Sequence, residues 1–206
     1  MSSGIRKSYL CPFCLDADPQ KSTEVFSDMR SQSGLKPLFS NVSRTGVSLG
    51  DEIERMSKAF DSIIIDTGGR DSKEMRKAML KSNLVIIPTI PSQYDVPVLE
   101  NMLEIYDESR QVNEKLLAFV LVNRASPNPF LFKELENLRE FISRIKAEKD
   151  LKNVVLLKSS LFERQAYRKA VVEGKSVSEF CDKNDKALQD FENFYKELLK
   201  SVEERL

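Results

Sequence analysis

The sequence contains no histidine and no tryptophan, and it has only three cysteines and seven glycines in 206 residues. Without histidine, catalysis by an imidazole and metal coordination by an imidazole are excluded. An odd number of cysteines argues against the disulfide framework of a small secreted protein. No apolar run reaches the roughly 18 residues that a membrane-spanning helix requires, and no signal peptide is recognisable. We therefore expect a cytoplasmic protein.

The sequence also lacks an excess of charge of either sign, since Lys and Arg together number 32 and Asp and Glu together number 32. Net charge therefore predicts neither a nucleic-acid nor a membrane partner, and any basic patch has to be local. Hydrophobic residues make up 41% of the chain and charged residues 31%, which indicates a globular protein with a substantial core. Because no internal repeat, low-complexity segment or linker is present, we expect a single domain over residues 1–206.

Short apolar runs alternate along the chain with longer amphipathic stretches. Strands that alternate with helices of about 10 to 18 residues indicate βαβ units and a parallel sheet. We expect strands at 38–42, 60–66, 84–88, 116–122 and 154–157, and an interrupted strand around the proline of 10–14. We expect helices at 23–31, 51–59, 71–79, 131–149, 161–172 and 185–204, and a further helix that follows a turn at 91 and reaches 106.

Two of these helices carry more detailed signals. The segment DSKE, Asp71–Glu74, has the form of a capping box and is expected to start the helix that follows. In the last helix, five large side chains recur at helical spacing and form one stripe: Leu188, Phe191, Tyr195, Leu198 and Val202.

The segment FDSIIIDTGG, Phe60–Gly69, organises the rest of the chain. Three consecutive isoleucines suit a strand buried on both faces of a parallel sheet. The strand ends on Asp66, and open α/β sheets bind their ligands at the carboxyl ends of the strands. An acid followed by Gly68 and Gly69 is typical of a magnesium and phosphate site. A buried strand that merely ends in a turn is an equally good interpretation of the segment alone.

Five segments in this order resemble the ParA family of deviant Walker partition ATPases, in particular its short plasmid-type members. They are LDADPQ (15–20), FDSIIIDTGG (60–69), SNLVIIPTIPSQYD (82–95), LAFVLVNRA (117–125) and SLFERQAYRKAVVEGKSV (160–177). The resemblance runs from Leu15 to the C-terminus. It implies a three-layer, P-loop-NTPase-like fold of the ParA/MinD type, with a mostly parallel sheet flanked by helices.

The resemblance implies ATP or ADP and Mg²⁺ as cofactors, and it assigns roles to the acids. Asp18 would position the attacking water, and Asp16 would support it electrostatically. Asp66 matches the Walker B acid, which reaches Mg²⁺ through water. Gly68 and Gly69 would let the backbone approach the phosphate. Taken alone, the acids of LDADPQ are better explained by an Asp–Pro turn.

The resemblance also implies roles for residues further along the chain. Asn123 matches the asparagine that reads adenine, and the segment 88–95 matches a loop near the nucleotide and the dimer partner, with Ser92, Gln93 and Asp95 as its polar candidates. Non-specific DNA binding falls to basic residues of the C-terminal part, whose phosphate contacts would depend strongly on salt. These basic residues are Arg164, Arg168, Lys169 and Lys175. Helical spacing would place the two arginines on one helix face. A solvated helix face is the alternative interpretation.

One part of the family pattern is missing. The phosphate-binding loop has the form G-x-x-x-x-G-K-[S/T], but only Gly4 precedes Gly34, and residues 1–14 are atypical. The single GKS, Gly174–Ser176, has lysine where the first glycine should be and is a chance match. We therefore expect impaired ATP hydrolysis. A truncated or frame-shifted gene, a chain that differs from its natural gene, and a natural non-hydrolysing relative all remain open.

The function that the resemblance implies is DNA partition in plasmid or chromosome segregation. An ATP-dependent homodimer would bind nucleoid DNA and be reset when a centromere-binding, ParB-like partner stimulates hydrolysis. The main alternative is a ParA-like dimerisation and DNA-binding module without enzymatic activity. A thiol-disulfide oxidoreductase based on Cys11-Pro-Phe-Cys14 is a distant alternative. The tail 195–206 balances its charges, so no membrane partner is expected.

Overall fold

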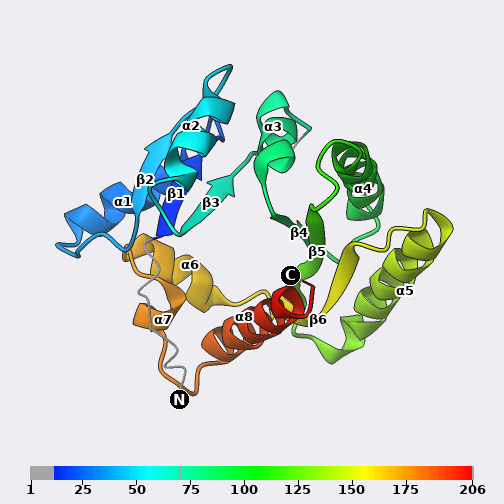
Figure 1. Cartoon of the computed structure of the whole chain (residues 1–206). Coiled ribbons are helices and arrows are strands. Elements are labelled where there is room, and N and C mark those ends of the chain that lie inside the picture. The colour runs from blue at the N-terminus through cyan, green and yellow to red at the C-terminus, as the bar shows by residue number, and fades with distance from the viewer. Residues whose placement is uncertain (1–11, 70, 206) are drawn as a thin grey trace, which may run out of the picture. The chain divides into compact units, whose positions relative to one another are not determined.

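The computed structural model of the chain describes residues 12–69 and 71–205. The chain divides into two compact units, Met1–Lys81 and Ser82–Leu206, each with its own sheet and helices (Figure 1). We describe each unit by itself.

The first unit is built on a parallel sheet with the strand order β2-β1-β3. Its strands are β1 (Pro12–Asp16), β2 (Ser40–Ser43) and β3 (Ser62–Asp66). Within the described residues, the central strand β1 is continuous from Pro12 to Asp16. The interruption that we expected around this proline is therefore absent from Pro12–Asp16.

Three helices accompany this sheet: α1 (Ser22–Gln32), α2 (Leu49–Ser57) and α3 (Lys73–Lys81). The buried side of α2 packs with residues of β1 in one apolar cluster, as the helical spacing of Ile53 and Met56 predicts. The start of α3 differs in detail from the predicted capping box. The hydroxyl of Ser72 accepts from the amide of Met75 at 3.0 Å, whereas Asp71 forms an ion pair with Arg76.

The exposure of β3 differs from the sequence prediction. Ile63 and Ile65 pack against the cluster formed with β1 and α2, as expected. The side chain of Ile64, which points to the opposite face of the strand, is 63% exposed within the described residues. The prediction of burial on both faces is therefore wrong for this strand. In its own unit, β3 is an edge strand with only one face covered.

The second unit is built on a parallel sheet with the strand order β4-β5-β6. Its strands are β4 (Leu84–Thr89), β5 (Leu117–Ala125) and β6 (Val154–Phe162). The central strand β5 is buried from Leu117 to Val122, which its unbroken apolar run predicts. Both β5 and β6 are longer than predicted, and their pairing is irregular between Val120 and Ala125.

The helices of the second unit are α4 (Asp95–Arg110), α5 (Phe132–Glu148), α6 (Gln165–Val172), α7 (Val177–Phe180) and α8 (Lys186–Glu203), with a short 3-10 turn at Pro129–Leu131. The last helix contacts β6 (Figure 1). Its buried side is shifted from the predicted stripe, because Phe194 enters the core whereas Tyr195 is 46% exposed. Glu197 fixes the helix by accepting from the amides of Lys158 and Ser159, both at 2.7 Å.

The two parallel sheets with their flanking helices confirm the predicted α/β class. Among the described residues, no helix is long and apolar enough to cross a membrane.

Candidate functional site

The carboxyl ends of β1 and β3 bring two acids together. The strands run parallel, and Asp16 and Asp66 are paired in the sheet register. The amide of Ala17 donates to the carbonyl of Asp66 at 2.8 Å, which keeps the two strand ends aligned beyond the last pair. The structure therefore places the predicted acids at the edge of the sheet where α/β proteins bind ligands.

Asp16 holds the turn that leads from β1 to α1. Its carboxylate is fully buried, and its Oδ1 accepts from the amide of Asp18 at 3.0 Å. Its Oδ2 accepts from the amide and the hydroxyl of Thr23, at 3.0 and 2.6 Å. Both oxygens are thus engaged within the protein, which suits a positioning role. Thr23 belongs to no motif. The only sequence signal for its contact with Asp16 is a hydroxyl side chain seven residues after the acid.

Asp18 lies in the turn after β1 and is half-buried. Its Oδ1 accepts from the amide of Gln20 at 2.9 Å, in the Asx geometry typical of an Asp–Pro turn. A β-carbon built on Gly68 would lie 3.5 Å from Oδ2 of Asp18, so this glycine and this acid are neighbours. The two residues belong to separate sequence motifs, and the fold of the first unit brings them together.

Gly68 and Gly69 show no local requirement for glycine. The β-carbon built on Gly68 makes only ordinary van der Waals contact, and one built on Gly69 meets nothing within 4 Å. The predicted role of the two glycines, close approach of the backbone to a phosphate, is therefore not imposed by packing within the protein and stays a prediction.

The three acids create a local excess of negative charge. Burial raises the pKa of Asp66 above its usual value of 3.8, and the charges of Asp16 and Asp18 raise it further. Among the described residues, no ion pair joins any of the three acids to a lysine or arginine. A bound cation would relieve this repulsion and restore the pKa of Asp66 toward its usual value.

The donor set fits a hydrated divalent cation better than a directly ligated one. Within the described residues, no group of three or more acidic or cysteine side chains is arranged to hold a metal ion directly. Asp16 already uses both of its oxygens, so Asp66 and Asp18 are left to contact the ion. Mg²⁺ keeps several of its waters when it binds to proteins. The water-mediated contact that the resemblance implies for Asp66 stays a prediction.

The cysteine next to this site is poorly suited to redox catalysis. Cys14 is buried in the middle of β1, and burial, together with the charges of Asp66 and Asp16, raises its pKa to about 11. A thiol that stays protonated is a weak nucleophile. Cys11, the other half of the predicted Cys-Pro-Phe-Cys motif, lies outside the described residues.

In the second unit, Asn123 lies near the carboxyl end of β5, inside the strand rather than after it. Its side-chain oxygen accepts from the amide of Arg124 at 3.0 Å, and Arg124 has a left-handed backbone with φ of 52°. The pairing of β5 with β6 is irregular between Val122 and Ala125, the stretch that contains Asn123. The adenine-reading role of Asn123 stays a prediction.

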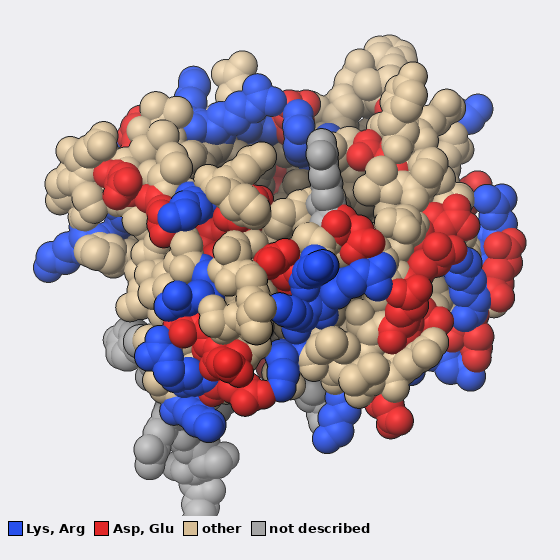
Figure 2. All heavy atoms as spheres, turned by 90° about the horizontal axis from the view of Figure 1, so that it is seen from above, with Lys and Arg blue, Asp and Glu red and all other residues tan. Residues whose placement is uncertain are grey.

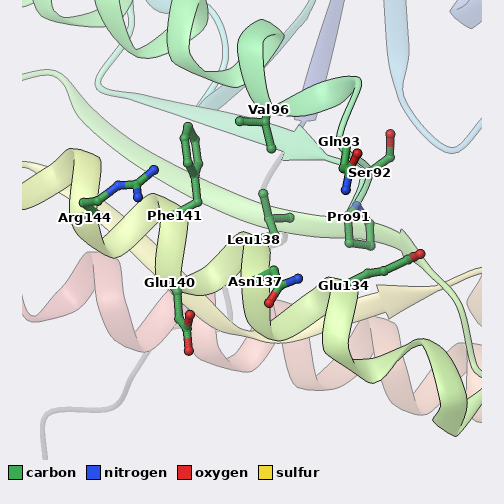
Figure 3. Close-up of a pocket in the computed structure, with 10 residues that line it drawn as sticks. All are labelled: Pro91, Ser92, Gln93, Val96, Glu134, Asn137, Leu138, Glu140, Phe141 and Arg144. Carbon is green, nitrogen blue, oxygen red and sulfur yellow. The ribbon is translucent and has the colours of Figure 1, made fainter.

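The loop before α4 borders a pocket of about 590 Å³ within the second unit (Figure 3). Ser92 and Gln93, two of the three polar candidates of this loop, line it, whereas Asp95 begins α4 and does not. In Figure 3, Val96 and Phe141 point toward the pocket and Glu140 points away. The opposite wall belongs to α5, for which the sequence predicts only an amphipathic helix.

Three of the four basic residues predicted for DNA are engaged in ion pairs. Nε of Arg164 contacts Oδ2 of Asp190 at 2.9 Å in a largely buried ion pair, and the guanidinium lies over the ring of Phe162. Arg168 pairs with Glu163 at 2.6 Å. Arg164 precedes α6 instead of lying within it, so the prediction that both arginines share a helix face is wrong.

The arginines nevertheless meet in space. Arg164 and Arg168 line one small pocket of about 280 Å³ at the start of α6, together with Glu163 and Gln165. Lys175 pairs with Glu173 at 2.8 Å, whereas Lys169 is exposed and takes part in no ion pair among the described residues. Figure 2 shows the same mixture more broadly, with Lys and Arg beside Asp and Glu across the face in view.

The architecture defines an α/β protein of the P-loop-NTPase-like, ParA/MinD type. No model of a known protein family matches the sequence. Among curated proteins, the maintenance of carboxysome distribution protein A of Halothiobacillus neapolitanus is 23% identical over 194 residues. The match covers 91% of this chain and 82% of that protein.

Solved structures show the same fold. The complex of a Cyanothece McdA variant with ATP matches with a TM-score of 0.66 and 16% identity, over 93% of this chain and 86% of that one. A Borrelia burgdorferi B31 plasmid partition protein bound to AMPPNP gives 0.61 and 17%, over 94% and 88%. The Pyrococcus furiosus cell division ATPase MinD gives 0.63 and 15%, over 93% and 86%. These comparisons confirm the resemblance to the ParA family.

Proposed function

We propose that this protein is a ParA-type positioning protein that binds DNA as a nucleotide-dependent homodimer and segregates a plasmid or chromosome. The observation that carries the proposal is the group of acids at the ends of β1 and β3, where Asp16 and Asp66 are paired in register and no described lysine or arginine forms an ion pair with Asp66 or Asp18. Solved structures of the same fold bound to AMPPNP and to ATP support an adenine nucleotide as the ligand.

In the proposed mechanism, Mg²⁺ bound to a nucleotide would supply charge neutralisation for the phosphates. Asp66 would hold the hydrated ion through its waters. Asp18 would accept a hydrogen bond from the attacking water and so orient it. Asp16 would act indirectly, because the hydrogen bonds that it accepts from Thr23 and from the amide of Asp18 fix the turn that carries Asp18.

Hydrolysis is expected to be impaired, because the sequence contains no G-x-x-x-x-G-K-[S/T] loop. The single GKS does not replace it. Gly174 follows the end of α6 with φ of 65°, and the hydroxyl of Ser176 caps α7 by accepting from the amide of Glu179. Without backbone amides and a lysine around the phosphates, binding and transition-state stabilisation both weaken.

The DNA contacts would come from the exposed basic residues around α6. Lys169 has no ion pair among the described residues, and the ion pair of Arg168 is exposed. Both side chains could therefore contact a DNA phosphate with little loss of free energy from existing interactions. Such contacts would carry no sequence preference and would place the protein on nucleoid DNA in the cytoplasm.

The stimulating partner would be a centromere-binding, ParB-like protein if the cargo is DNA. The curated relative is named for carboxysome distribution, so the same mechanism with a different cargo is a further proposal. A non-enzymatic dimerisation and DNA-binding module is the second candidate function, and the absence of a G-x-x-x-x-G-K-[S/T] pattern from residues 1–206 favours it for these residues.

Calorimetric titration of the chain with Mg·ATP tests the proposal. We expect micromolar or weaker binding that Asp66→Ala abolishes and that Asp61→Ala, at an exposed acid immediately before β3, leaves unchanged. Retained DNA affinity without nucleotide binding would support the non-enzymatic module. Absence of both nucleotide and DNA binding would contradict the proposed function.

A further inference from the structure

Helix α6 carries two of the basic residues proposed for DNA, yet its own packing does little to fix its position. The helix spans eight residues, and within the described part of the chain only Ala170 among them is buried. Helices of this length are marginal on their own, and most helical stability in proteins comes from packing of an apolar face. The position of α6 therefore has to be set by contacts with neighbouring elements.

Helix α8 supplies such contacts at three points. Near its start, the carbonyl of Ala187 accepts from the hydroxyl of Tyr167 in α6 at 2.8 Å. One turn later, Asp190 pairs with Arg164, the N-cap residue of α6, at 2.9 Å. About two turns further along, Glu197 accepts from two amides of β6, the strand that leads to α6. Because of this spacing, Asp190 and Glu197 lie on the same face of α8.

The contact of Glu197 falls on a bulge of β6. Between two paired positions, β6 places three residues opposite one residue of β5, and a bulge interrupts the ladder of backbone hydrogen bonds. Here the amides of Lys158 and Ser159 donate to the Glu197 carboxylate, both at 2.7 Å. From α5, Arg139 donates to the carbonyls of Leu157 and Lys158, at 3.1 and 2.6 Å. The bulge is therefore held through its backbone by one acid and one arginine.

We propose that Asp190 and Glu197 of α8 are positioning residues that hold α6 where its basic side chains can contact DNA. Glu197 fixes the strand shortly before α6, and Asp190 fixes the first turn of the helix. The inference rests on the proposed DNA binding by α6. Both acids are negatively charged and repel DNA, so loss of their charge by itself would tighten binding. A positioning role predicts the opposite sign.

Fluorescence anisotropy with a labelled duplex at several salt concentrations tests this sign. Glu197→Ala is expected to raise the dissociation constant about five- to tenfold, because fewer molecules hold α6 in the binding position. The slope of log affinity against log salt should stay the same, since Glu197 would contact no phosphate. Glu192→Ala removes the same charge from an exposed ion pair of α8 and should leave the dissociation constant unchanged or lower it. Unchanged or tighter binding by Glu197→Ala overturns the proposal.

Two milder variants separate the effect of position from the effects of charge and of folding. Glu197→Gln removes the same charge as Glu197→Ala but keeps one oxygen that can accept, so its effect should be smaller. Tyr167→Phe removes only the hydroxyl that reaches Ala187, and it should raise the dissociation constant about two- to threefold with no change of charge or slope. Equal effects of the two Glu197 variants, together with no effect of Tyr167→Phe, would show that charge alone matters and would overturn the proposal.

Hydrogen exchange of the free protein tests the positioning without DNA. In Glu197→Ala, the amides of residues 158–172 should exchange faster than in wild type, whereas those of α4 should exchange at the same rate. Equal acceleration in α4 would mean that the whole unit loses stability, and it overturns the proposal. Absence of DNA binding by wild type would contradict the proposed function, and the exchange pattern would still decide whether α8 positions α6.

Discussion

The acids of the first unit and the basic residues of the second unit differ in how their charges are compensated. Asp16, Asp18 and Asp66 gather at the ends of β1 and β3 without an ion pair to any described lysine or arginine. Arg164, by contrast, is matched by Asp190 in a largely buried pair. Charge that a fold leaves uncompensated points to an absent ligand, whereas compensated charge serves the fold.

The largest effect expected within this comparison is on stability, from removal of Asp16. Asp16→Ala would leave the amides of Asp18 and Thr23 and the hydroxyl of Thr23 without their acceptor in a buried site. We expect a loss of about 2–4 kcal/mol in the free energy of unfolding. Urea denaturation followed by circular dichroism measures it, with the exposed Asp28→Ala as the control. A loss no larger than that of the control would mean that Asp16 is not a positioning residue.

The ion pair of Arg164 is expected to give the next largest effect. Because Arg164 and Asp190 are 22% and 14% exposed, Arg164→Ala should cost about 1–2 kcal/mol of unfolding free energy. Arg168→Ala, which breaks an exposed pair, should cost less than about 0.5 kcal/mol. Thermal or urea unfolding of both variants separates them. Equal costs would show that the two pairs do not differ in the way we describe.

The effects of the two arginines on DNA binding should have the reverse order, with Arg168→Ala larger than Arg164→Ala. Arg168→Ala and Lys169→Ala should each reduce the slope of log affinity against log salt by about 1, as expected for a lost phosphate contact. Lys133→Ala, at the start of α5, provides a control that should leave the slope unchanged. Fluorescence anisotropy with a labelled duplex at several salt concentrations measures the slope. Unchanged slopes for both α6 variants would remove this helix from the DNA interface.

A smaller effect is expected from the titration of Asp66. Its folded pKa is raised above 3.8, so the folded protein holds this proton more tightly than the unfolded chain does. The stabilisation from protonation is full below pH 3.8 and is lost as the pH rises through the raised pKa. Wild type should therefore lose stability relative to Asp66→Asn over this interval. Urea titrations of both proteins from about pH 3.5 to neutrality measure the difference in their free energies of unfolding. A constant difference would contradict the raised pKa.

Much of this fold follows from patterns that local physics enforces. The apolar run of β5 and the helical spacing of Ile53 and Met56 lead directly to buried elements, because periodicity reports which side of an element meets the core. The acids at the strand ends are predicted for a different reason, because parallel strands place their carboxyl ends at one edge of the sheet.

Other features depend on neighbours that periodicity does not report. Ile64 is exposed because β3 is an edge strand with one covered face, and an isoleucine run alone cannot distinguish this from a central strand. Arg164 lies outside α6 because β6 continues to Phe162 through an irregular pairing with β5. Thr23 meets Asp16 only because the turn after β1 folds back, and the motif LDADPQ contains no sign of that partner.

Thermal unfolding of wild type and Asp66→Asn with and without Mg²⁺ tests the central claim most directly. A cation site formed by uncompensated acids predicts that Mg²⁺ raises the midpoint of wild type and leaves that of Asp66→Asn unchanged, because a ligand stabilises only the state that binds it. An equal rise in both proteins, or no rise in either, would contradict the account.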